Sequence, residues 1–66
     1  MTYSDIKKAR EICPSAWRTI VILMDRGSLD IQSLDYRFVH MDSDQVLAHR
    51  EPVTMIGYYF VYKIEG

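Results

Sequence analysis

Apolar and polar positions alternate most regularly near the end of the chain, over residues 58–64. This stretch is rich in aromatic and β-branched residues, which fit a pleated surface, and it predicts a β-strand. Phe60 and Tyr62 would form one face of this strand, which we expect to pack in the core, and Tyr59 and Val61 would form the other. An isolated strand leaves its backbone unpaired, so a partner must lie just before it, in an earlier strand or in another chain.

Helical spacing dominates the first part of the chain. Residues 5–12 are expected to form a short helix, because apolar side chains recur three to four positions apart at Ile6, Ala9 and Cys13. Ser4 is the expected N-cap, since serine is favoured at that position. Pro14 disfavours helical backbone at the residue before it but suits a first turn. We therefore expect Pro14 to separate this helix from a second one.

The second helix is predicted over residues 15–26. One face of this helix would carry four apolar residues: Trp17, Ile20, Val21 and Met24. Trp17 is expected to contribute to the core. Gly27 stands at a typical position for a helix C-terminus. A strand over residues 19–24 is the competing interpretation, because this run is rich in β-branched residues.

The middle of the chain is ambiguous between helix and strand. For residues 31–39 we favour a helix, although Leu34, Tyr36 and Phe38 also alternate as they would in a strand. Asp42 and Gln45 have the spacing of a capping box, which predicts a further helix over residues 43–50.

These elements predict a single small domain over residues 1–66 of the α+β class. It would be rich in helix and end in a β-strand or hairpin, in an order that resembles a winged helix. The alternative is one helix packed on a three-stranded antiparallel sheet.

Charge is distributed unevenly along the chain, although its net value is only −1. Residues 1–24 carry four basic side chains against two acidic ones, whereas residues 25–51 carry three basic side chains against six acidic ones. A nearly neutral chain with an acidic middle has no general attraction to nucleic acid or to anionic lipid.

No pattern of residues points to catalysis, a metal or a cofactor. The sequence lacks a nucleophile motif and a glycine-rich phosphate loop, and His40 and His49 are not at the spacing of a metal-binding helix. Cys13, the only cysteine, is interpreted as a small buried apolar residue. We therefore expect a cytoplasmic protein that is not an enzyme and does not cross a membrane.

The favoured function is that of a protein-binding regulator or inhibitor, which occupies a surface of a larger protein or complex. Bacteriophages and other mobile elements encode small accessory proteins of this kind. The residues predicted to contact the partner are Tyr36, Arg37, Tyr59 and Val61, because aromatic residues and arginine dominate interface hot spots. A homodimer that forms through the terminal strand is a further prediction.

The alternative function is a DNA-binding transcriptional regulator of the winged-helix type. In that arrangement the helix over residues 43–50 would enter the major groove and present Gln45, His49 and Arg50. Nucleic acid is the less favoured partner, because acidic residues flank this helix and DNA phosphates would repel them.

Overall fold

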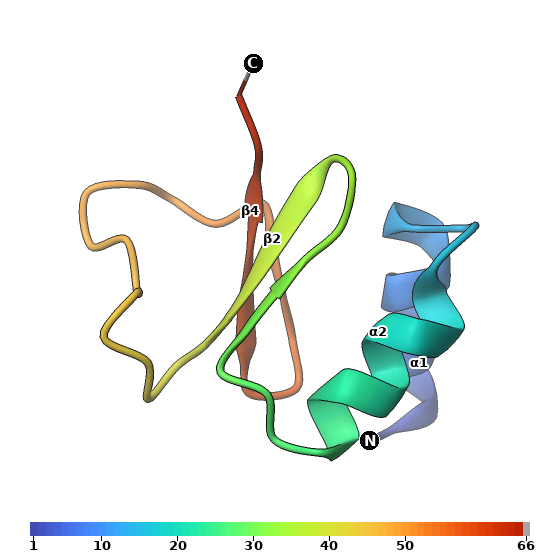
Figure 1. The fold of residues 1–66 in the computed structure, drawn as a ribbon. Helices are drawn as coiled ribbons and strands as arrows, with labels where there is room; N and C mark the ends of the chain where they lie inside the picture. Colours follow the sequence, from blue (N-terminus) through green and yellow to red (C-terminus); the bar gives the residue numbers. More distant parts are fainter. Residues whose placement is uncertain (66) are drawn as a thin grey trace.

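Two helices lie against one face of a four-stranded antiparallel sheet in the computed structural model, which describes residues 1–65 (Figure 1). The elements in chain order are α1 (Tyr3–Ile12), α2 (Trp17–Asp25), β1 (Asp30–Gln32), β2 (Tyr36–His40), β3 (Thr54–Ile56) and β4 (Tyr59–Lys63). The strand order across the sheet is β1-β2-β4-β3, so β2 and β4 are central. The α+β class is confirmed.

A capping box begins α1, but its N-cap is Thr2 and not Ser4 as predicted. The Thr2 hydroxyl accepts a hydrogen bond from the Asp5 N–H, and the Thr2 N–H donates to the Asp5 carboxylate. The same carboxylate accepts a bond from the Gly57 N–H in the turn between β3 and β4. The bond with the Thr2 side chain, and then those with the two backbone N–H groups, lower the pKa of Asp5.

Loss of this cap is the first prediction. Thr2→Ala is expected to lower the free energy of unfolding by about 1 kcal/mol, because an N–H in the first turn of α1 loses its acceptor. Ser4→Ala is the matched control and is expected to change it by less than about 0.5 kcal/mol, since an exposed position away from the cap contributes little. Urea denaturation followed by circular dichroism measures both. Equal losses would contradict the assignment of Thr2 as the cap.

The predicted second helix is confirmed as α2, and the competing strand over residues 19–24 is not formed. A Schellman motif ends the helix, in which the Ser28 N–H donates to the Leu23 carbonyl and the Gly27 N–H donates to the Met24 carbonyl. Gly27 has a φ of 76°, in the left-handed region that favours glycine. The chain therefore turns sharply from α2 into the sheet.

The predicted helix over residues 31–39 is wrong, since these residues form β1, a turn and β2. Ser33 builds the turn: its hydroxyl donates to the Tyr36 carbonyl and accepts a bond from the Tyr36 N–H. Phe38 then pairs with Ile31 on one side and Val61 on the other. The alternation along β2 outweighs the helical spacing because it places Phe38 in the core.

The predicted helix over residues 43–50 is also wrong, because residues 41–53 contain turns but no helix or strand. The Ser43 hydroxyl accepts a bond from the Gln45 N–H, which forms a local turn in place of the expected cap by Asp42. The segment lies over the face of the sheet that is turned away from the helices (Figure 1). Its Val46 and Leu47 side chains are half-buried.

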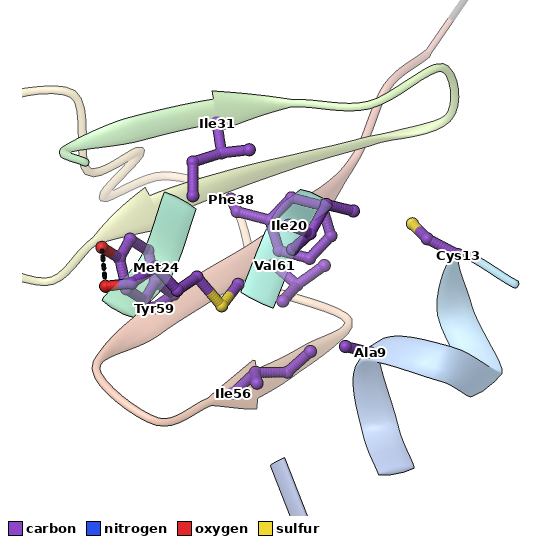
Figure 2. Close-up of a cluster of buried hydrophobic side chains, with 9 residues drawn as sticks. All are labelled: Ala9, Cys13, Ile20, Met24, Ile31, Phe38, Ile56, Tyr59 and Val61. Carbon is purple, nitrogen blue, oxygen red and sulfur yellow. Dashed lines mark hydrogen bonds between the residues drawn. The ribbon is translucent and has the colours of Figure 1, made fainter. Parts of the chain in front are cut away.

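The core lies between the helices and the sheet, where side chains from both helices meet all four strands (Figure 2). It is formed by Ala9, Cys13, Ile20, Met24, Ile31, Phe38, Ile56, Tyr59 and Val61. The interpretation of Cys13 as a buried residue is confirmed. Trp17 is only half-buried at the edge of this core.

The two faces of the terminal strand are the reverse of those predicted. Tyr59 and Val61 face the helices and are buried, whereas Phe60 and Tyr62 lie on the opposite face, where Tyr62 is buried and Phe60 half-buried. Because residues 41–53 cover this second face, both faces of β4 carry large apolar side chains. Alternation alone cannot show which of two such faces meets the helices.

Both edges of β4 are occupied, which answers how the terminal strand is paired. It pairs with β2 on one side and with β3 on the other, so the expected pairing with residues just before it is confirmed. Because β4 has no free edge, a homodimer could not form by adding a strand to it.

One buried hydroxyl connects the end of α2 to the sheet. The Tyr59 hydroxyl lies 2.6 Å from the Ser28 carbonyl oxygen, to which it donates. It also lies 3.3 Å from the Met24 carbonyl oxygen, a second acceptor (Figure 2). Burial, and next the negative charge of Asp25, raise the pKa of Tyr59. The neutral tyrosine is thus the form that this site stabilises.

Candidate protein-binding surface

The four residues predicted to bind a partner do not form one surface. Tyr36, Tyr59 and Val61 all lie on the face of the sheet turned toward the helices, where Tyr59 and Val61 are buried and Tyr36 packs against the core. Arg37 lies on the opposite face. The fold therefore removes Tyr59 and Val61 from the surface.

Arg37 is held by interactions within the protein. Its guanidinium forms an ion pair with both carboxylate oxygens of Asp30: Nη2 lies 2.8 Å from Oδ2, and Nε lies 3.3 Å from Oδ1 and 3.2 Å from Oδ2. Nη2 also donates to the side-chain oxygen of Gln45 at 3.5 Å. Arg37 therefore connects β2 to β1 and to residues 41–53, the segment that covers the second face of the sheet, and this role is structural.

The three residues predicted to bind nucleic acid are exposed in the irregular segment 41–53 and not on a helix. Gln45 accepts the bond from Arg37, and Arg50 donates to the Lys63 carbonyl at 2.7 Å while its guanidinium lies 5.9 Å from the Tyr62 ring centroid. His49, the third of these residues, is exposed in the same segment. The recognition helix that DNA binding would use is thus absent from the described residues.

A different group of side chains comes together where α1 and α2 meet. They line a surface hollow of about 440 Å³ and combine aromatic with basic residues: Tyr3, Lys7, Arg10, Glu11, Pro14 and Trp17. We call these residues, together with Arg18 of α2, the Trp17 surface. Both helices supply it, so its members are held on a rigid scaffold.

Trp17 is the centre of this surface. The guanidinium carbon of Arg10 lies 5.1 Å from the Trp17 ring centroid, and that of Arg18 lies 5.0 Å from it, both within the range of a cation–π interaction. Tyr3, at the rim, is 79% exposed. A half-buried tryptophan between two arginines is the composition found at interface hot spots.

The cations of the Trp17 surface have no acidic partner. Among residues 1–65, no carboxylate oxygen lies within 4.0 Å of the charged nitrogens of Lys7, Arg10 or Arg18, although Glu11 lines the same hollow. By contrast, Lys8 on the neighbouring side of α1 is turned to the sheet and donates to the Met55 carbonyl. The Trp17 surface therefore presents unpaired positive charge to solvent.

A second hollow, of about 450 Å³, lies where the N-terminus of α1 meets the β3–β4 turn. Two of its polar side chains are already used within the fold: the Asp5 carboxylate accepts bonds from Thr2 and Gly57, and the Tyr59 hydroxyl donates to a backbone carbonyl. This hollow thus offers a ligand fewer uncommitted groups than the Trp17 surface.

The basic N-terminal part is evident in the sequence, but the Trp17 surface is not. Trp17 was expected in the core, and Arg10 and Trp17 belong to different helices, so only the angle between these helices brings them together. The excess of basic residues over residues 1–24 is the one signal that pointed to it.

Searches of residues 1–65 for a metal site and a membrane-spanning helix, and of known proteins for relatives, found none. Within residues 1–65, no group of three or more His, Cys, Asp or Glu side chains is arranged to hold a metal ion. No helix in the same range has the length and apolar character to span a membrane. No family model, curated protein or solved structure matches the chain.

Proposed function

We propose that this protein is a small cytoplasmic regulator or inhibitor that acts by binding, without catalysis, and that it occupies an acidic surface of a larger protein through its Trp17 surface. The observation that carries the proposal is Trp17 with the guanidinium groups of Arg10 and Arg18 over its ring. Among residues 1–65, neither guanidinium has a carboxylate oxygen within 4.0 Å, although Glu11 lines the same hollow. Tryptophan, tyrosine and arginine are the residues most enriched in hot spots.

The chemistry of this surface favours an acidic protein over nucleic acid. Lys7, Arg10 and Arg18 give it positive charge, but the covering segment 41–53 is acidic and would be repelled by an extended polyanion. A folded partner with one local acidic patch would contact only the helical side. Positive charge around an aromatic anchor would speed its encounter with such a patch.

Charge reversal at the centre of the surface tests the proposal. Arg10→Glu/Arg18→Glu is compared with Arg26→Glu/Lys63→Glu, which makes the same change in net charge at exposed positions elsewhere. The original protein and both variants are used as bait to capture a partner protein from extracts of cells that produce the original protein. The affinity of the captured partner for each of the three is then measured by calorimetry. The first variant is expected to bind at least about 30-fold more weakly, which corresponds to a hot-spot loss of about 2 kcal/mol.

The control variant is expected to bind as the original protein does, and circular dichroism confirms that both variants are folded. Equal affinity of the two variants would overturn the assignment of the Trp17 surface. Salt-sensitive retention on immobilised DNA, lost in the first variant, would show that the surface binds nucleic acid and would overturn the protein-binding function.

A further inference from the structure

The two edges of the sheet are protected unequally. At the β3 edge, the Lys8 side chain of α1 donates to the Met55 carbonyl at 3.3 Å and so occupies an outward-facing backbone group. At the β1 edge, no side chain within residues 1–65 bonds the backbone of Asp30 or Gln32, and both residues are exposed. An uncovered edge is a template for another strand.

The backbone of β1 presents its free groups outward. The His40 N–H donates to the Leu29 carbonyl and the Ser33 N–H donates to the Tyr36 carbonyl, so Leu29, Ile31 and Ser33 bond toward β2. In an antiparallel pair the residues between them point away. The N–H and C=O groups of Asp30 and Gln32 therefore face outward, ready to form a ladder.

The side chains at this edge do not oppose pairing. Asp30 is the only charged residue of β1, and the bidentate bond from Arg37 neutralises it. Two large apolar side chains flank the strand: Leu29 is 57% exposed and Leu34 is 92% exposed. Edge strands usually carry charges that prevent pairing, whereas this one carries a neutralised charge between two exposed leucines.

We propose that the β1 edge is the seam of a homodimer, in which β1 of a second copy pairs with it antiparallel about a two-fold axis at Ile31. This register places Asp30 opposite Gln32 of the second copy, so no like charges meet. Gln32 is already opposite Arg37 within one copy. A row therefore crosses the seam from the positive Arg37 and the neutral Gln32 of one copy to the negative Asp30 of the second copy.

The apolar side chains fit the same register. This register puts Leu29 of each copy opposite Ser33 of the other and one position from its Leu34. Leu34 follows β1 in the turn and lines a hollow together with Cys13 and Ala16, so it lies on the helix side of the sheet, as Leu29 and Ile31 do. The outcome is a continuous sheet in which each copy supplies four strands. This self-complementarity favours a second copy over an unrelated extended peptide as the occupant of the edge.

Charged substitutions at the two leucines test the seam and its register. Sedimentation equilibrium is expected to show that the original protein approaches twice its monomer mass of 7.8 kDa as concentration rises. Leu29→Lys alone and Leu34→Glu alone are each expected to weaken the dimer at least about tenfold. Met55→Lys, at the opposite edge, is the control and is expected to leave the dimer unchanged.

Mixing the two variants is the decisive step. A Leu29→Lys copy and a Leu34→Glu copy can form one Lys–Glu contact and one Leu–Leu contact, so the mixture is expected to recover the dimer that each variant has lost. A protein that stays monomeric at about 1 mM would overturn the proposal. A dimer that is insensitive to both leucine substitutions, or a mixture that gains nothing, would also overturn it.

Discussion

Replacing Phe38 with alanine is expected to lower the free energy of unfolding by about 3–5 kcal/mol. Phe38 is fully buried at the centre of the core, between Ile31 of β1 and Val61 of β4. A core in a chain of this size rarely supplies more than about 3–5 kcal/mol, so the variant is expected to be largely unfolded at 25 °C. Circular dichroism and the fluorescence of Trp17 measure this directly.

Tyr58→Ala is the control for this experiment, because Tyr58 is 70% exposed and its loss is expected to change stability by less than about 0.5 kcal/mol. A Phe38→Ala protein that retained a cooperative urea transition within about 1 kcal/mol of the original would contradict the placement of Phe38 at the centre of the core.

Tyr59→Phe is expected to cost about 1–3 kcal/mol of stability, although it removes a single oxygen atom. The change leaves the Ser28 carbonyl without the hydroxyl that now donates to it, whereas the Met24 carbonyl keeps its bond from the Gly27 N–H. Tyr58→Phe is the matched control, since Tyr58, the neighbouring tyrosine, is 70% exposed and loss of its hydroxyl is expected to change stability by close to zero. Urea denaturation at pH 7 compares the two, and equal losses would contradict the role of the Tyr59 hydroxyl.

The same hydroxyl gives stability a dependence on alkaline pH. The pKa of Tyr59 in the folded protein is raised above its ordinary value of 10.0, first by burial and then by the charge of Asp25. The folded state therefore binds this proton more strongly than the unfolded chain does. Its contribution is complete below pH 10 and is lost as pH rises through the raised pKa. Above pH 10 the original protein is thus expected to lose stability more steeply than Tyr59→Phe; parallel curves would contradict this.

The helices could be predicted from the sequence because their signals are local. Pro14 separates them and Gly27 ends the second, and both act through backbone geometry that does not depend on the rest of the fold. The strand over residues 58–64 was predicted for a similar reason, since its alternation is long and regular.

The middle of the chain could not be predicted because its structure depends on distant contacts. Phe38 suits either a helix or a strand until β4 is placed beside it, and the apparent capping box at Asp42 loses to a turn at Ser43. Because the covering segment 41–53 buries the second face of the sheet, the two faces of β4 could not be distinguished either. The Trp17 surface depends on how two helices meet, which no local pattern encodes.

The strand order has a consequence for how the protein is made. Synthesis delivers α1, α2, β1 and β2 before β3 and β4, yet β4 is the strand that lies between β2 and β3. The nascent chain can form its helices and the first hairpin early, but the side of Phe38 next to β4 stays uncovered until Val61 has left the ribosome and paired with it. A chain emerging at about 5–20 residues per second would thus expose its main core residue for roughly a second or more, during which a chaperone or a second nascent copy could reach it.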